Sequence, residues 1–322
     1  MRALKVGSLL TIGLAPVLIA QQRGYFASER LNVDIVNYTN GAEIVPSLAA
    51  GQIDAGLSIA PSAGLLNALA RGLEVKIVAS NGTIKPHRNI GNIIIRKDLA
   101  PVSGFLDLSS LTPPIRAAAT VEGILPHAIV LLEAEKAGFH LSDVNMSFLA
   151  LPDMNAALQN RQIEIAASGE PLITIAEQQG IAVRWHEMAD DFSDVPYSTM
   201  LYGPNLLNTD PSAGVRFMRA YLQATRDYED AFTRGKDHDA IVGMLADPLK
   251  TPAPLFKAIQ DGGGLAYIDP NGEVNVDTLK PILDLWARTG LIQIQAQPGF
   301  DISTLVDSRP AQQAVASMGR YS

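Results

Sequence analysis

Short apolar runs alternate with helix-like stretches through the first part of the chain. Strand candidates are Leu4–Leu10, Val33–Val36, Ile115–Ala119 and Val144–Phe148. Gly24 and Gly138 stand where the first helix of each half should end, because glycine suits the left-handed position after a helix. Each of the two successive parts of the chain is therefore predicted to fold as strand, helix, strand, helix, strand, helix. This alternation predicts an α/β fold with two lobes, each a mostly parallel sheet flanked by helices.

The chain also matches itself at a shift of 110 positions. Gly13-Leu14-Ala15-Pro16 is echoed by Gly123-Ile124-Leu125-Pro126. Leu48, with Gln52-Ile53-Asp54 and Ser58 after it, is echoed by Leu158, with Gln162-Ile163-Glu164 and Ser168 after it. Matches in register with similar apolar strands indicate that one α/β unit occurs twice.

A region of long amphipathic helices follows, from Tyr197 to Ser322. Phe217, Tyr221, Ala224 and Tyr228 recur at helical spacing, and Pro211 and Gly235 mark the expected start and stop of that helix. Further helices are predicted at Ala240–Ala246, Pro254–Gln260 and Val276–Thr289. The tail after Gln297 carries little periodicity, and we expect it to follow the surface.

The composition excludes several classes of function. The chain has 25 basic and 33 acidic residues and a net charge of −8, with no basic patch, so nucleic acid is not expected as a partner. The absence of cysteine excludes disulfides, thiolate metal sites and thiol nucleophiles. The apolar run Val6–Ala20 after Arg2 and Lys5 has the composition of a leader peptide, but the internal repeat places it inside the fold.

Catalytic motifs are weak. His186-Glu187 lacks the second histidine of the metalloprotease pattern, and Gly262-Gly263-Gly264 is not followed by the lysine of a phosphate loop. Asp237-His238-Asp239 is interpreted as a solvated loop between helices, and His127 as a packed or solvent-facing histidine rather than a cleft residue. We therefore expect no catalytic residue, no metal and no cofactor.

Several short motifs in order resemble those of the solute-binding proteins of ABC importers that serve taurine, aliphatic sulfonates, nitrate, bicarbonate and thiamine-pyrimidine precursors. They are Ala15-Pro16 leading to Gly24-Tyr25-Phe26, the run Leu48 to Gly56, Leu66-Asn67-Ala68-Leu69 with Gly72 and Val75, Ala157-Leu158 through Ile165, and Gly169-Glu170-Pro171 before a helix ending at Gly180. The resemblance covers most of the chain.

The resemblance implies a type II periplasmic-binding-protein fold with a ligand cleft between two lobes that close by hinge bending. The chain would cross between lobes near Gly91–Arg96 and again near Ser198–Pro204, so that residues 1–92 plus 200–322 form lobe one and residues 93–199 form lobe two. The implied partners are a small organic solute and the permease subunits, and the protein is expected to be a monomer. It would lie in the periplasm or be anchored outside the cytoplasmic membrane, with its leader absent from this chain. An enzyme on the same scaffold is the alternative, although relatives that make the thiamine pyrimidine use a cysteine-rich iron site, and this chain has no cysteine.

In parallel-sheet lobes, ligands bind where loops leave the carboxyl ends of strands and enter helices. The predicted ligand-binding residues in these loops are Thr11, Asn40, Gly41, Glu43, Ser58, Pro61, Asn81, Thr120, Glu122, Gly123, Asp153, Ser168 and Glu170. Helix capping is the open alternative for Asn40, Ser58, Thr120 and Asp153. For Glu170 the resemblance favours ligand contact over interaction with the dipole of the helix that follows.

The predicted site is acidic. Its loops contribute Glu43, Glu122, Asp153 and Glu170, and we expect no Arg or Lys nearer to the site than Lys85 and Arg88. A compact dianion would lack a bidentate arginine there. We therefore expect a small organic ligand bearing N–H or O–H donors, such as a heterocycle, rather than nitrate or bicarbonate.

Overall fold

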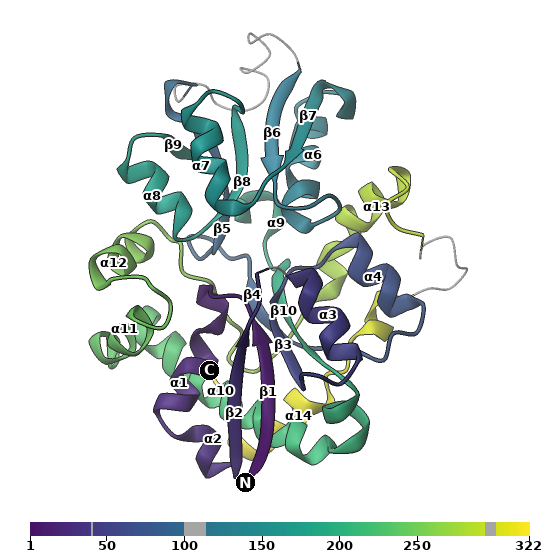
Figure 1. Ribbon diagram of the computed structural model, residues 1–322, viewed down its shortest axis with the longest axis vertical. Coiled ribbons are helices and arrows are strands. Elements are labelled where there is room, and N and C mark those ends of the chain that lie inside the picture. Colours follow the sequence, from purple (N-terminus) through teal and green to yellow (C-terminus); the bar gives the residue numbers. More distant parts are fainter. Residues whose placement is uncertain (40, 100–113, 294–300) are drawn as a thin grey trace.

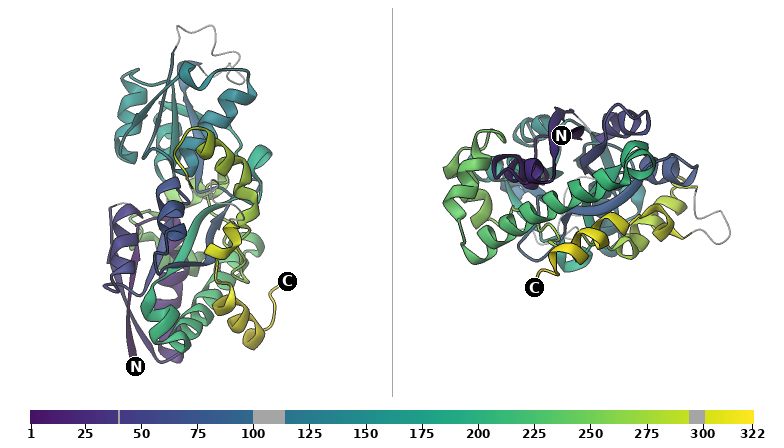
Figure 2. Two further views of the ribbon diagram at one scale, coloured as in Figure 1. Left: turned by 90° about the vertical axis from the view of Figure 1, so that its right-hand side faces the viewer. Right: turned by 90° about the horizontal axis from the view of Figure 1, so that it is seen from below.

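A computed structural model describes residues 1–39, 41–99, 114–293 and 301–322. Two five-stranded sheets lie at opposite ends of its long axis, and helices cover them (Figures 1 and 2). We call the sheet containing the N-terminal strand and its helices lobe one, and the other sheet and its helices lobe two. Within the described residues no helix is both long and apolar enough to cross a membrane.

The two sheets have equivalent strand orders. Lobe one is ordered β2-β1-β3-β10-β4 and lobe two β7-β6-β8-β5-β9. The strand bounds are β1 Arg2–Ser8, β2 Leu31–Asn37, β3 Ala55–Ile59, β4 Lys76–Thr83, β5 Gly91–Arg96, β6 Ile115–Ala119, β7 Val144–Phe148, β8 Ile165–Gly169, β9 Ala182–His186 and β10 Pro196–Tyr202. The predicted duplication is visible in the structure, because each early strand of lobe one has a counterpart in lobe two.

The fourth strand of each sheet arrives from the other lobe. In lobe one β10 runs antiparallel to β3 and β4, and in lobe two β5 runs antiparallel to β8 and β9. The remaining neighbours are parallel: β1 pairs with β2 and β3, and β6 pairs with β7 and β8. The predicted boundaries after residues 92 and 199 fall inside β5 and β10, each of which belongs whole to one sheet. The exact domain limits stay a prediction.

Helices connect and cover the strands. Their bounds are α1 Ala15–Gln22, α2 Tyr25–Ser28, α3 Gly41–Ala49, α4 Ala63–Ala70, α6 Leu125–Lys136, α7 Leu151–Gln159, α8 Leu172–Gln178, α9 Ala189–Phe192, α10 Pro211–Arg234, α11 His238–Ala246, α12 Ala253–Asp261, α13 Lys280–Arg288 and α14 Arg309–Met318. The predicted limits of α10 are confirmed. Asp210 caps its start by accepting a bond from the Ala213 N–H, and Gly235 ends it with φ 72°.

No helix was predicted in the tail after Gln297, but residues 309–318 form α14. Its buried residues are Pro310, Ala311 and Ala314, so small side chains face the protein and the hydrophobic pattern is weak. The helix packs along α10 in lobe one (Figure 2).

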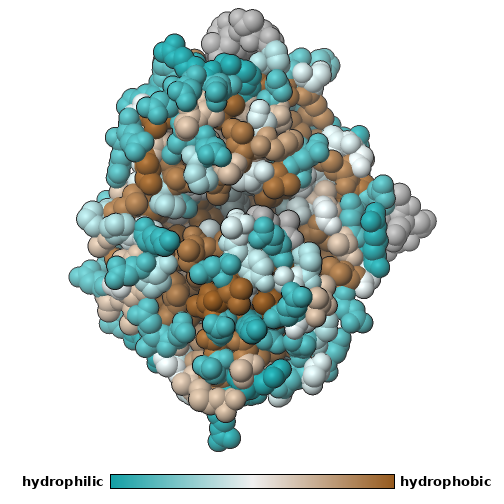
Figure 3. Space-filling view, viewed as in Figure 1, coloured by the Kyte–Doolittle hydropathy of each residue, from teal (hydrophilic) through white to brown (hydrophobic). Residues whose placement is uncertain are grey.

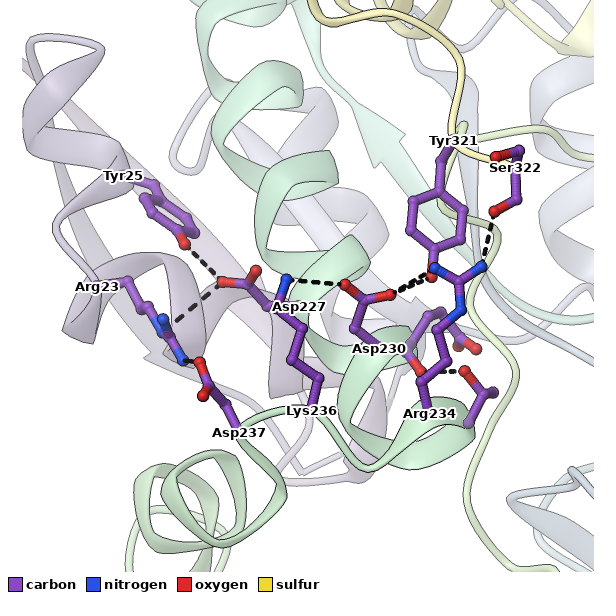
Figure 4. Close-up of polar contacts among 11 residues, drawn as sticks. Arg23, Tyr25, Asp227, Asp230, Arg234, Lys236, Asp237, Tyr321 and Ser322 are labelled. Atoms are coloured by element: carbon purple, nitrogen blue, oxygen red, sulfur yellow. Dashed lines mark hydrogen bonds and ion pairs between the residues drawn. The ribbon is translucent and has the colours of Figure 1, made fainter.

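Helix α10 also ties both ends of the chain to lobe one (Figure 4). Asp227 accepts a 2.5 Å hydrogen bond from the Tyr25 hydroxyl and pairs with Arg23 at 3.7 Å. One turn further on, Asp230 accepts a 2.6 Å bond from the hydroxyl of Tyr321. The N-terminal and C-terminal segments therefore share one lobe, as a chain that crosses twice requires.

Candidate ligand-binding site

The carboxyl ends of the parallel strands in the two sheets point toward each other at the middle of the molecule (Figure 1). Loops from opposite lobes make direct backbone contact there. The Ala63 N–H donates to the Gly123 carbonyl at 2.8 Å, and the Leu125 N–H donates to the Pro61 carbonyl at 3.2 Å. We call this contact between residues 61–63 and 123–125 the lobe bridge. It brings together Pro61 and Gly123, which were both predicted as site residues.

On lobe one, three hydroxyls gather where β1 and β3 end. The Ser58 Oγ lies 3.0 Å from the Thr11 Oγ1 and 3.4 Å from the Ser8 Oγ. We call Ser8, Thr11 and Ser58 the hydroxyl cluster. Ser58 has φ 59°, a left-handed conformation that is rare outside glycine and is concentrated at functional sites.

Asn81 holds this cluster in place. Its Oδ1 accepts a 2.8 Å bond from the Ser58 N–H, and its Nδ2 donates to the Gly13 carbonyl at 2.7 Å. A Cβ on Gly13 would lie 2.7 Å from the Ser58 Oγ, so glycine is required for this close approach. Asn81 is fully buried, so it supports the predicted residue Ser58 from inside lobe one and presents no surface of its own to a cleft.

On lobe two, the loop after β6 is fixed by a histidine. The His127 Nδ1 accepts a 3.1 Å bond from the Gly123 N–H, and its ring meets the Phe148 ring edge-on at 5.5 Å. Burial lowers the pKa of His127 below its ordinary value of 6.5, and the charge of Glu122 opposes that only in part. His127 is thus a neutral, packed acceptor near neutral pH, while Glu122 is exposed and Thr120 half-buried.

Glu170 has surroundings that the sequence did not predict. Its side chain has no exposed surface, its Oε1 lies 2.6 Å from the Arg184 Nη2, and its Oε2 accepts a 3.1 Å bond from the Thr174 N–H. Burial raises the pKa of Glu170, and the Arg184 charge opposes that rise. The expectation that the site carboxylates have no cation nearby is wrong for Glu170. This carboxylate gives no support to a ligand rich in donors.

The remaining predicted residues differ in accessibility. Ser168, at the end of β8, is 1% exposed, and its Oγ has no hydrogen-bond partner among the described residues. Glu43 and Asp153 are exposed in the first turns of α3 and α7, where a carboxylate also favours the helix dipole. Gly41 begins α3, and Asn40 lies outside the described residues.

Apolar side chains at the same strand ends were missed by the sequence reasoning. Leu10, Val121 and Phe148 are 40%, 51% and 43% exposed. Apolar surface borders the hollow at mid-height on both lobes (Figure 3). Leu10 and Val121 each lie two residues past the end of a strand, and an apolar residue at that place in the sequence is a signal that could have identified both as site residues.

The chemistry of this region is that of binding. It offers hydroxyls, backbone amides and apolar surface, and no group of three or more His, Asp or Glu able to hold a metal occurs among the residues that the structure describes. Such a surface can orient a small molecule by hydrogen bonds and apolar contact.

Comparison with known proteins places this arrangement in context. A model of the NMT1-like family matches residues 1–242. A Brucella abortus (strain 2308) protein named as a candidate binding protein is 27% identical over 220 residues, which are 68% of this chain and 64% of that protein. The match thus spans less than two thirds of the length of that relative. A candidate aliphatic sulfonates-binding protein of Escherichia coli (strain K12) is 26% identical over 244 residues, 74% of this chain and 69% of that one.

Solved structures show the same fold. The periplasmic aliphatic sulphonate binding protein of Escherichia coli superposes with a TM-score of 0.71 at 20% identity, covering 97% of this chain and 92% of that one. The periplasmic nitrate-binding protein of Synechocystis PCC 6803 gives a TM-score of 0.76 at 16% identity, covering 99% and 89%. The predicted two-lobed periplasmic-binding-protein fold is confirmed.

Proposed function

The chain belongs to the NMT1-like family, and on that premise we propose that it captures one small organic solute between its lobes and releases it chemically unchanged. The observation that carries the proposal is the pair of equivalent sheets whose strand ends meet at the middle of the molecule, with hydroxyl and amide groups in the loops between them. Binding proteins enclose ligands in this way by hinge closure.

The hinge is expected in the connections between the lobes rather than in the predicted crossover segments themselves. The predicted crossover segments are sheet strands, β5 and most of β10, whose hydrogen bonds resist bending. Residues 84–90 and 193–195 connect these strands across the lobes. The two connections contact each other, since the Ile84 N–H donates to the Val195 carbonyl at 2.9 Å and the Asp194 N–H donates to the Ile84 carbonyl at 2.9 Å. We place the hinge in this pair of connections.

The partners and location are part of the proposal. Relatives in sequence and structure are named as binding proteins, and two solved relatives as periplasmic. We therefore propose that the protein acts outside the cytoplasmic membrane and delivers its solute to the permease subunits of an ABC importer. Sulfonates and nitrate, named for those relatives, belong in the first panel of candidate solutes.

A thermal-shift screen over sulfonates, carboxylates, nitrate and pyrimidines tests the capture of a solute. A solute at 100 times its dissociation constant should stabilise the native state by about 2.7 kcal/mol. Any compound that binds is then incubated with the protein, recovered and weighed by mass spectrometry. Recovery of the unaltered compound at one per chain supports the proposal, and catalytic formation of a new product would overturn it.

A further inference from the structure

Few large apolar side chains are exposed among the described residues. Leu10, Val121, Phe148 and the terminal Met1 are the large hydrophobic residues that the described part of the chain leaves exposed. Single exposed apolar residues are ordinary, whereas a group of them at one place marks a binding surface. Apart from Met1, all of them follow or end a parallel strand at its carboxyl end.

Two of them occupy equivalent places in the two lobes. Leu10 lies two residues after β1 and Val121 two residues after β6, and these strands hold the same position in their sheets. Leu10 precedes Thr11 of the hydroxyl cluster, and Val121 stands two residues before Gly123 of the lobe bridge. Each lobe therefore exposes one aliphatic side chain on a loop that also carries polar groups of the candidate site.

Phe148 adds an aromatic face that is held in place. It ends β7 and packs edge-on against His127 at 5.5 Å, and His127 is itself bonded to the Gly123 N–H. A ring that is fixed on one side and exposed on the other is a typical anchor for a ligand, because little conformational freedom is lost on contact.

We infer that Leu10, Val121 and Phe148 form an apolar wall of the solute site, and that the solute is an amphipathic organic molecule. Its polar head binds Thr11, the member of the hydroxyl cluster that keeps accessible surface, since Ser8 and Ser58 are 0% and 9% exposed, and its hydrocarbon or aromatic body covers the wall. This inference rests on the proposed function and names its ligand class. A compact anion would leave the wall exposed to water, which is why a solute with an apolar body fits the site better.

Titration calorimetry with three linear series, alkanesulfonates, alkanecarboxylates and primary alcohols from two to eight carbons, tests the inference, with nitrate as the compact anion. Burial of each methylene is worth about 0.8 kcal/mol, so affinity in the best series should rise about fourfold per carbon until the wall is covered. Phe148→Ala should weaken binding of the longest chain about three- to tenfold and leave the two-carbon member within about twofold.

Met1→Ser, made behind an N-terminal tag that supplies the start codon, is the matched control, because Met1 is an exposed apolar residue outside the site, and it should change neither value. Affinity that is independent of chain length, or a chain-length gain that survives in both Phe148→Ala and Val121→Ser, would overturn the inference. Binding of nitrate with no binding by any of the three series would also overturn it and leave solute capture standing. Failure of every compound in both panels would remove the proposed function as well. If the same variants impair only transport through the permease and not solute binding, the wall is a docking surface and the inference is wrong.

Discussion

Replacing Ala63 with proline should loosen the contact between the lobes and leave α4 intact. Ala63 is the first residue of α4, where proline is well accommodated because that N–H has no partner within the helix. Ser62 before it has φ −146° and ψ 154°, the extended conformation that a following proline favours. The substitution removes one donor, the Ala63 N–H that bonds the Gly123 carbonyl at 2.8 Å, and it places the proline Cδ where that hydrogen pointed, so the two loops must also move apart.

The loss of that bond sets the smallest effect to expect. A backbone hydrogen bond contributes about 0.5–1.5 kcal/mol net, so its loss alone should shift the equilibrium between bridged and separated lobes about 2- to 13-fold, and the steric contact with the Gly123 carbonyl adds to this shift. The second bond of the lobe bridge, from the Leu125 N–H to the Pro61 carbonyl, keeps its donor and its acceptor. We therefore expect a larger separated population.

Spin labels on the two lobes can measure this population. Glu74→Cys and Asn160→Cys place labels at exposed positions before β4 and β8, and the chain has no other cysteine to react. Pulsed electron resonance should show a greater share of long distances in the Ala63→Pro protein. Ala63→Ser keeps the N–H and should match the parent. An identical distance distribution in all three proteins would refute the view that the lobe bridge holds the lobes together.

Three further substitutions test individual side chains. Because burial lowers the pKa of His127, the unfolded chain takes up the proton first, and the free energy of unfolding should fall as the pH drops below about 6.5. His127→Asn keeps an acceptor for the Gly123 N–H, so melting curves between pH 5 and 7 should show that it loses this pH dependence of stability. The Ser58→Gly protein should be about 1 kcal/mol more stable than the Ser58→Ala protein, because φ of residue 58 is 59°. Calorimetry should show that both variants bind solute more weakly than the parent. Equal melting temperatures of the two variants would exclude backbone strain at this position. Burial raises the pKa of Glu170, so the native state holds the proton more tightly and the stability of the parent protein should fall as the pH rises above 4.5. Glu170→Gln should remove this pH dependence of stability. Because Arg184 still lies beside position 170, the same variant should change solute affinity less than twofold.

The repeated unit was predictable because it is encoded in local patterns. Helix α3 at Gly41–Ala49 and helix α7 at Leu151–Gln159 are offset by the predicted 110 residues, as are β3 and β8. Apolar spacing, glycine at helix ends and proline at helix starts all act within a few residues, so each element can be read from its own segment.

Contacts across a sheet were not predictable in the same way. Arg184 lies on β9, which β5 separates from β8, and it reaches Glu170 because α8, the helix after Glu170, packs against β9. No local pattern contains this arrangement. The helix α14 was missed for a different reason, since alanines form its buried face and give little hydrophobic contrast. The exposed residue Leu10 continued an apolar run and was therefore assigned to a strand that ends at Ser8.

The peptide groups around Gly123 connect solute contact to lobe contact. Its N–H is held by His127 of lobe two, and its carbonyl accepts from Ala63 of lobe one. Val121 of the apolar wall lies two residues earlier on the same loop, so a solute touching Val121 and Leu10 together contacts both lobes. A ligand shifts a conformational equilibrium only by its differential affinity for the two states. The two backbone bonds of the lobe bridge, at about 1 kcal/mol each, act together with the packing of α13 on α6, where Arg288 pairs with Glu135, to favour the bridged form without solute. The methylenes of an amphipathic solute, at about 0.8 kcal/mol each when buried between the lobes, add to this advantage and shift the equilibrium further toward the closed form.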